Sequence, residues 1–169
     1  MKMLSPQNVR LALVKATRKT WSTLLHKAAD PVPSVVRQVG NYSLESIVHF
    51  EGAWSGSLSL VAAPGNATHW ASAMFGVDAD HCCDDDILDA AGELANIIAG
   101  GVKTLLPEGT VLTPPRVKVR PPQPRGPRSP IISAVEFGDA PMNFVVALLG
   151  PATRKHPDFN KKKTVRTPS

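Results

Sequence analysis

A carboxylate and an amide, Glu93 and Asn96, stand three positions apart in a segment whose apolar residues recur with the period of an α-helix. Side chains at i and i+3 are neighbours on a helix, so these two polar groups share one edge. The same side carries Asp89, Gly100 and Lys103, and all five residues fall within an arc of about 80° by helical geometry. We expect the function of the protein on this polar face, although an ordinary solvated helix surface has the same pattern.

Two adjacent cysteines, Cys82 and Cys83, are the other residues that could do chemistry. A vicinal pair could bind a soft metal or act as a redox switch, but neighbouring residues do not easily reach disulfide geometry. His81 is adjacent, yet three consecutive residues do not point at one ion, and no His/Cys cluster at zinc spacing accompanies them. We therefore expect two reduced, incidental thiols and no metal site.

The polar face belongs to a helix that the sequence predicts from Asp84 to Leu106. Aspartates at 84–86 supply an N-cap candidate and place negative charge at the positive end of the helix dipole. Pro107 cannot continue the helix. The other side is a continuous apolar stripe, typical of a helix packed on a core: Ile87, Leu88, Ala91, Leu94, Ala95, Ile98, Val102, Leu105 and Leu106.

Two glycines, Gly92 and Gly100, interrupt this helix beside or within its polar face. Each disfavours the helix by about 1 kcal/mol relative to alanine. Either the backbone of a partner must approach Glu93 and Asn96 closely, or the helix packs closely against another element of the same chain. The sequence leaves both explanations open.

The chain has 169 residues, of which 43% are hydrophobic and 20% charged, values typical of one globular domain. It contains no apolar run near the 18 or so residues of a membrane span and no signal-peptide pattern at its N-terminus, so we expect a cytoplasmic protein.

The net charge of +5 is unevenly distributed along the chain. From Arg154 onward there are six basic residues and one acidic residue, so this tail carries a charge equal to that of the whole chain. Between Asp30 and Val111 there are two basic and eleven acidic residues. An acidic body has the wrong sign for binding phosphate backbones, so we expect neither nucleic acid nor a membrane as the main partner. Binding of either one through Lys161–Arg166 remains a minor alternative.

Further helices and strands are predicted from helix-start residues, from the alternation of apolar and polar residues, and from turn residues. A basic amphipathic helix is predicted from Ser5 to about Ala29, and a short helix over Ala67–Phe75. The Arg120–Pro130 loop is either a stiff strand connection or a polyproline ligand. Strands are predicted at Ser34–Val39, Ser43–Glu51, Trp54–Ala63, Val111–Val119, Ile131–Phe137 and Met142–Leu149. This order predicts an α+β fold, a mainly antiparallel sheet with two long helices packed across one face.

The segment Glu93-Leu94-Ala95-Asn96-Ile97-Ile98-Ala99-Gly100, preceded by Asp89-Ala90-Ala91-Gly92 and followed by Lys103, resembles the CheX branch of the CheC/CheX/FliY family. The order of elements, the Gly-x-x-x-Gly-x-Leu-x-Leu hairpin at 52–60 and the short helix ending in Met74-Phe75-Gly76 extend the resemblance over residues 6 to 149. One departure is Gly101, which stands where members of the family commonly have an asparagine.

Members of that family dephosphorylate the chemotaxis response regulator CheY. The resemblance implies that Asn96 orients the attacking water, that Glu93 pairs with the active-site lysine of a CheY-like receiver, and that the receiver supplies the Mg²⁺. We expect the partner to contact Asp89, Gly92, Ile97, Gly100 and Lys103 around this pair. The alternative is a CheX-like adaptor that binds a receiver or another signalling protein without catalysis.

The resemblance also bears on the organisation of the chain. It implies a CheX-like domain over residues 1–150 that forms a homodimer through sheet edges. The basic residues 151–169 are then expected to be a disordered tail outside that domain.

Overall fold

A computed structural model describes residues 4–33, 43–119, 129–139 and 143–152. These residues form a seven-stranded antiparallel sheet in the order β1–β6–β7–β3–β2, with β4 and β5 both paired to the outer edge of β2. The strands are β1 (Asp30–Pro31), β2 (Leu44–Gly52), β3 (Gly56–Ala62), β4 (Thr110–Leu112), β5 (Arg116–Val119), β6 (Ile131–Gly138) and β7 (Phe144–Leu149).

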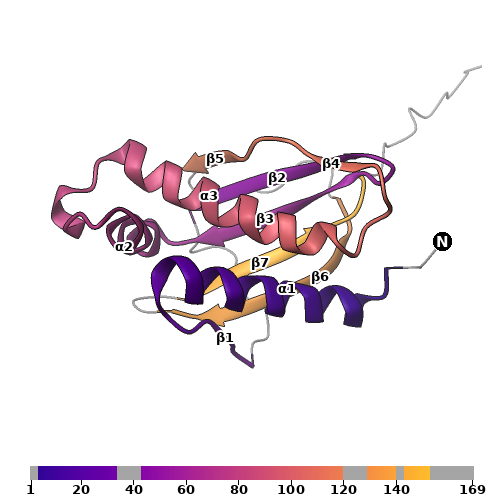
Figure 1. The fold of residues 1–169 in the computed structure, drawn as a ribbon, viewed down its shortest axis with the longest axis horizontal. Coiled ribbons are helices and arrows are strands. Elements are labelled where there is room, and N and C mark those ends of the chain that lie inside the picture. The colour runs from indigo at the N-terminus through magenta and orange to yellow at the C-terminus, as the bar shows by residue number, and fades with distance from the viewer. Residues whose placement is uncertain (1–3, 34–42, 120–128, 140–142, 153–169) are drawn as a thin grey trace, which may run out of the picture.

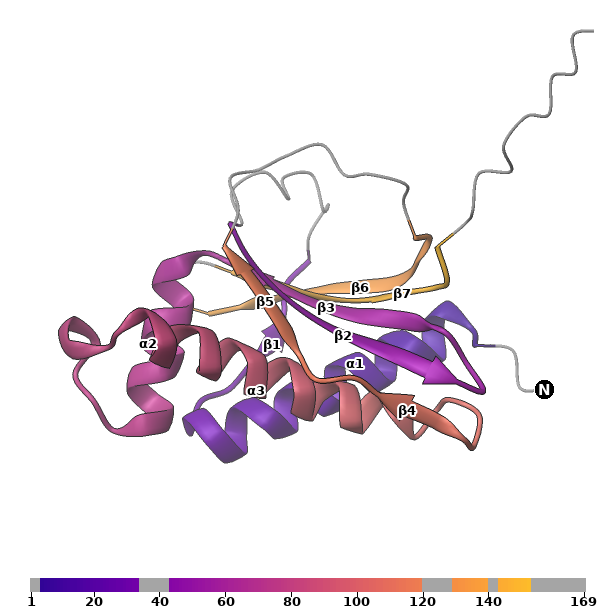
Figure 2. The same ribbon diagram turned by 90° about the horizontal axis from the view of Figure 1, so that it is seen from above.

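The helices lie together on one face of the sheet. Helices α1 (Pro6–Thr20) and α3 (Asp84–Lys103) run in opposite directions across it, and α2 (Pro64–Phe75) packs at the end where α3 begins (Figure 1). The view along the sheet shows all three helices on the same side (Figure 2). This arrangement confirms the predicted α+β fold with two long helices across one face.

The first helix starts as predicted and ends earlier. Ser5 caps it by accepting a hydrogen bond from the backbone N–H of Asn8 at 3.1 Å. After Thr20 the chain forms a π-helical turn, Trp21–Leu25, and leaves it at His26, whose φ is 53°. A π-turn changes the direction in which side chains point, and here both ends of the turn, Trp21 and Leu25, are buried.

Several predicted strands are confirmed with different bounds. Ser43–Glu51 and Trp54–Ala63 correspond to β2 and β3. The predicted strand Val111–Val119 is wrong as one element, because Pro114 and Pro115 lack backbone donors and divide it into β4 and β5.

The short strand β1 was not predicted; it pairs with β6 through Asp30 and Pro31. The predicted strand 34–39, most of the Arg120–Pro130 loop and most of the predicted tail lie outside the described residues.

Aromatic rings fill the core between the helix layer and the sheet. Trp21 stacks on Phe144 with ring centroids 4.4 Å apart, and Trp70 meets both rings edge to face. Trp70 also donates from its indole nitrogen to Asp139 at 2.7 Å, which ties α2 to the end of β6. This cluster joins the C-terminal end of α1 and helix α2 to the sheet. No helix in the described parts of the chain has the length and apolar character of a membrane span.

Candidate functional site

The long helix α3 begins at Asp84 as predicted, but its N-cap is Cys83. The backbone N–H of Cys83 donates to Asp86 at 3.0 Å, and its thiol donates to the same carboxylate oxygen at 3.1 Å. These two bonds hold the pKa of Asp86 below its ordinary value. The predicted N-cap role of the aspartates at 84–86 is therefore wrong, and one of the thiols predicted to be incidental caps the helix.

The helix ends at Lys103, three residues before the predicted end at Leu106. The backbone N–H groups of Leu105 and Leu106 bond three residues back, to Val102 and Lys103, which tightens the chain into a turn. Leu105 is consequently 37% exposed, although the stripe predicted it to face the core. Leu94, Ala95, Ile98 and Val102 are fully buried, as predicted.

The polar face is open to solvent along α3. Asp89, Glu93, Gly100 and Lys103 are exposed, and Asn96 is partly exposed. Ile97 is 37% exposed and adds an apolar side chain at the edge of this face. The structure thus places six of the seven predicted site residues at one accessible surface, which we call the α3 stripe: Asp89, Glu93, Asn96, Ile97, Gly100 and Lys103.

The seventh residue, Gly92, is buried. A Cβ atom there would lie 3.4 Å from Pro115 and 3.4 Å from Val117, at the start of β5. Gly92 therefore packs against its own chain, and the structure does not support the partner contact that we predicted for it.

The consecutive glycines at 100 and 101 differ in how closely other parts of the chain approach them. A Cβ atom at Gly101 would lie 2.9 Å from the Cβ of Ala16, so the backbones of α1 and α3 approach closely at this point. A Cβ atom at Gly100 would meet no atom within 4 Å. The close contact with Ala16 accounts for the glycine at position 101, whereas no contact in the described structure requires glycine at position 100.

The α3 stripe lies between two flanks that sequence reasoning did not identify. Helix α1 borders it at the contact between Ala16 and Gly101, and Pro115 with β5 borders it at Gly92. The Pro114-Pro115 pair was the available signal, because two prolines inside a predicted strand indicate a break. The closeness of α1 had no such signal, since Ala16 and Gly101 are far apart in the sequence.

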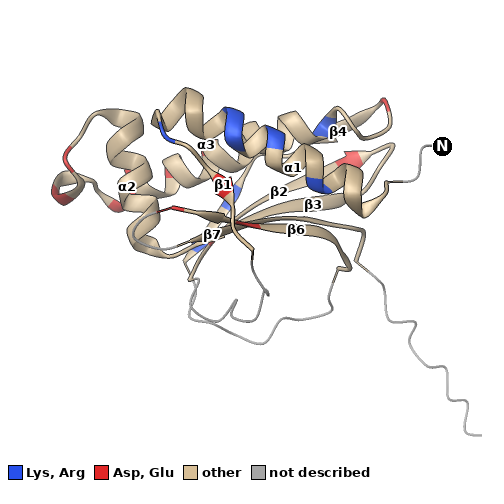
Figure 3. Ribbon diagram, turned by 90° about the horizontal axis from the view of Figure 1, so that it is seen from below, with Lys and Arg blue, Asp and Glu red and all other residues tan. Residues whose placement is uncertain are grey.

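Charges of opposite sign occupy the two long helices. Figure 3 shows acidic residues gathered where α2 meets the start of α3, and basic residues spaced along α1. Cys82 lies nearby, and burial raises the pKa of its thiol above the ordinary value. The carboxylates of Asp86 and Asp78 and the thiol of Cys83 raise it further. Across the described parts of the chain, no three His, Cys, Asp or Glu residues gather in a way that could hold a metal ion.

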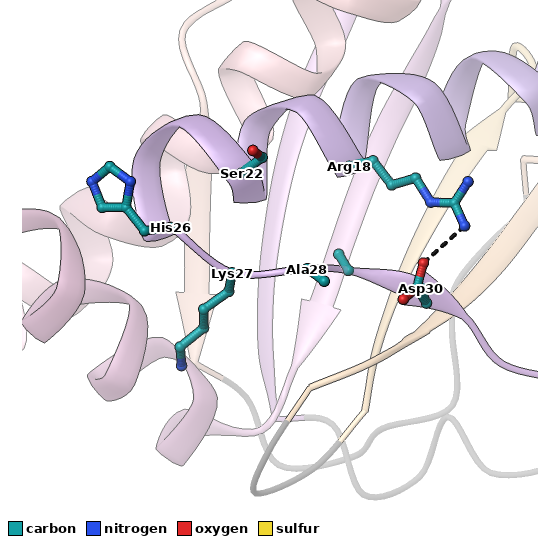
Figure 4. A pocket seen from close by; sticks show the side chains of 7 residues that line it. Arg18, Ser22, His26, Lys27, Ala28 and Asp30 are labelled. Carbon is teal, nitrogen blue, oxygen red and sulfur yellow. Dashed lines mark hydrogen bonds and ion pairs between the residues drawn. The ribbon is translucent and has the colours of Figure 1, made fainter.

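An open depression of about 530 Å³ lies at the end of α1, outside the α3 stripe. Arg18, Ser22, His26, Lys27 and Asp30 are among the residues that line it. Arg18 is paired with Asp30 at 2.8 Å, while the side chains of His26 and Lys27 point in different directions (Figure 4). Because the polar side chains that line this depression do not converge on one point, they do not form a binding site.

Comparison with known families identifies one match within the chain. Residues 44–122 match the model of the chemotaxis phosphatase CheX. This segment contains β2, β3, α2, the whole of α3 and β4 and β5. No curated protein sequence matches the chain.

Several solved structures share the fold. The chemotaxis protein CheX of Desulfovibrio desulfuricans has a TM-score of 0.69 at 24% identity, covering 85% of this chain and 99% of its own. CheX of Vibrio vulnificus has a TM-score of 0.69 at 17% identity, covering 86% and 97%.

A third similar structure is the complex of CheX with CheY, BeF3 and Mg²⁺ from Borrelia burgdorferi. It has a TM-score of 0.59 at 18% identity, covering 84% of this chain and 96% of its own. FliY of Thermotoga maritima also has this fold, with a TM-score of 0.55. The family match around α3 and the shared fold confirm the resemblance seen in the sequence: residues 44–122 match the CheX family model, and the chain has the fold of CheX and FliY proteins.

Proposed function

We propose that this protein hydrolyses the acyl phosphate of a phosphorylated CheY-like receiver. The observation that carries the proposal is the exposed pair of Glu93 and Asn96 on a rigid, core-packed helix within the segment that matches the CheX phosphatase family. A CheX relative of the same fold has been captured with CheY, BeF3 and Mg²⁺, which supports a receiver as partner and the receiver as the source of the metal ion.

The reaction needs little covalent chemistry from this chain. A water molecule attacks the phosphorus atom in line, the bond from phosphorus to the receiver's aspartate oxygen breaks, and inorganic phosphate leaves. Catalysis is then mainly positioning and charge stabilisation. The Asn96 amide can accept a hydrogen bond from the water and donate one to an oxygen nearby, which is sufficient to orient it.

Glu93 serves as the docking group in this proposal. It lies one turn before Asn96 on the same edge, so a partner that pairs a lysine with Glu93 brings its reacting phosphate to Asn96. Gly100 lies one turn beyond Asn96 and leaves space for the backbone of the receiver. Asp89, Ile97 and Lys103 complete the docking surface along the α3 stripe.

The test is the decay of acetyl-phosphate-labelled receivers from the same cell, with and without the protein. We expect one receiver to lose phosphate faster, and we expect Glu93→Ala and Asn96→Ala to abolish the acceleration. Glu108→Ala is the matched control, because Glu108 is an exposed carboxylate beyond the end of α3. Failure of all labelled receivers to respond would contradict the proposal.

The same experiment separates the phosphatase from the adaptor. If the protein is a phosphatase, the Asn96→Ala variant should bind the receiver normally but no longer accelerate loss of its phosphate. If it is an adaptor, the unchanged protein should bind a receiver without changing the rate at which that receiver loses phosphate.

We further propose the organisation that the family resemblance implies. Residues 1–150 form the CheX-like domain, residues 151–169 are a separate basic tail, and the domain forms a homodimer through a sheet edge in the cytoplasm. Light scattering of the full chain and of a chain ending at Gly150 tests both parts. Each chain is expected to have twice the mass of its own monomer, and a monomeric full chain would contradict the dimer.

A further inference from the structure

The outward side of α1 carries a row of cations. The helix contains Arg10, Lys15, Arg18 and Lys19 and no acidic residue, and all four side chains are exposed. Arg18 pairs with Asp30 at 2.8 Å. Among the described residues, no ion pair joins the other three to an acid, so their charges are free to act on a partner.

Two of these cations lie beside the α3 stripe. Ala16 faces Gly101 of α3, and the buried residues Val9, Leu13 and Thr17 define the inward side of α1. By helical geometry, Lys15 and Lys19 lie within about 100° of Ala16 on the outward side. Arg10 lies on the flank that faces away from α3 by the same geometry.

Lys15, Lys19 and Leu11 therefore form a surface that we call the α1 ridge. Leu11 precedes Lys15 by one turn and is 69% exposed, the highest exposure of any large hydrophobic side chain described. Because α1 and α3 touch through small residues, the α1 ridge and the α3 stripe are continuous. A partner that covers Asn96 and Gly100 also reaches the α1 ridge.

Charges of opposite sign lie at different places along these two surfaces. The first half of α3 presents Asp85, Asp89 and Glu93 to solvent, whereas Lys15 and Lys19 lie close to Ala16, which meets Gly101 in the second half of α3. A surface with both signs accepts a partner in one orientation, because the reverse orientation places like charges together.

We propose that the α1 ridge is part of the receiver docking surface and attracts the receiver through its positive charge. This inference rests on the proposed phosphatase function. A receiver holds Mg²⁺ through carboxylates and carries an anionic phosphoryl group, so the rim of its site is acidic. Glu93 pairs with a receiver lysine in the proposed function, whereas Lys15 and Lys19 attract the acidic rim. The α1 ridge thus selects receivers that carry acidic side chains beside the phosphorylated aspartate.

A membrane surface is a weaker match to the same lysines. Helices that lie in a membrane insert an apolar face. The apolar face of α1 is already in the core, where Val9, Leu13 and Trp21 are fully buried, and Leu11 is left outside.

The experiment is steady-state dephosphorylation of the responding receiver by the variant Lys15→Glu/Lys19→Glu. We expect KM to rise about tenfold or more at low ionic strength, kcat to stay within twofold, and the difference in KM to shrink as salt is added, because exposed charges are screened. Arg10→Glu is the matched control and is expected to leave KM within twofold. Thermal unfolding of each variant verifies that the fold is retained.

The outcomes separate this inference from the proposed function. Unchanged KM in the double variant, with normal activity, overturns the α1 ridge and leaves the phosphatase intact. Absence of activity in the unchanged protein overturns the phosphatase itself. Vesicles of phosphatidylcholine and phosphatidylserine form a separate arm: loss of vesicle binding in the double variant without a change in KM assigns the lysines to a membrane and overturns the inference.

Discussion

Gly100 and Gly101 are adjacent in the sequence and belong to different parts of the molecule. Gly101 lies against Ala16 of α1, where a side chain would collide with the neighbouring helix. Gly100 faces open space on the α3 stripe. Both weaken the helix by about 1 kcal/mol relative to alanine, but the packed glycine allows two helices to touch and the open one has no such role within the described chain. A glycine that the packing of the helices requires can thus be separated from one that we propose for contact with a receiver.

The largest effect on stability is expected from Gly101→Leu. The new side chain must separate α1 from α3, so the free energy of unfolding should fall by about 1–3 kcal/mol, as overpacking of a core does. Urea denaturation measures this change. Adding Ala16→Gly to the same variant should restore part of the loss, and additive effects of the two substitutions would show that the contact is unimportant.

Gly100→Ala should raise the stability of the protein and lower its activity. Alanine is the better helix former and meets no neighbour, so the free energy of unfolding should rise by about 1 kcal/mol. Phosphate release from the receiver should slow, because the methyl group occupies the space next to Asn96 that we propose for the backbone of the receiver. A variant that is more stable and equally active would remove Gly100 from the docking surface.

Gly92→Ala is the matched substitution on the packed side of the helix. Its methyl group would lie in ordinary contact with Pro115 and Val117, so the gain in helix propensity is partly offset and stability should change by less than about 1 kcal/mol. Phosphate release should be unchanged. A loss of activity comparable to that of Gly100→Ala would restore the partner contact that the sequence predicted.

The smallest effect concerns the start of α3 and depends on pH. Since hydrogen bonds from Cys83 lower the pKa of Asp86 in the folded protein, the carboxylate contributes stability above its unfolded pKa. This contribution is lost as the pH falls through the folded pKa. Asp86→Asn should therefore lower the midpoint temperature of thermal unfolding at neutral pH. In strong acid the variant and the unchanged protein should unfold at the same temperature. Asp84→Asn is the control, and an equal effect from it would contradict the cap.

Periodicity in the sequence was enough to predict much of the site. The stripe of Leu94, Ile98 and Val102 fixed which side of the long helix is buried, and so which side presents Glu93 and Asn96. Turn residues and alternation located most strands. These signals are local, and the structure confirms the fold class that they predict.

Contacts between distant residues were not accessible in the same way. Gly92 and Gly101 look alike in the sequence, and their neighbours, Pro115 and Ala16, come from other elements. The π-turn at Trp21 depends on the aromatic cluster that the ring enters. The cap at Cys83 was missed because cysteine is an uncommon N-cap, and three aspartates nearby gave a stronger local signal.

The most direct test of the open face is Asn96→Asp. This substitution keeps the shape of the side chain and replaces the amide donor with a negative charge. We predict that the variant folds normally and that phosphate release from the receiver is about 100-fold slower, as expected when a positioned donor is lost from an active site. Phosphate release at the rate of the unchanged protein would contradict the role of Asn96, and with it the assignment of the α3 stripe as the phosphatase site.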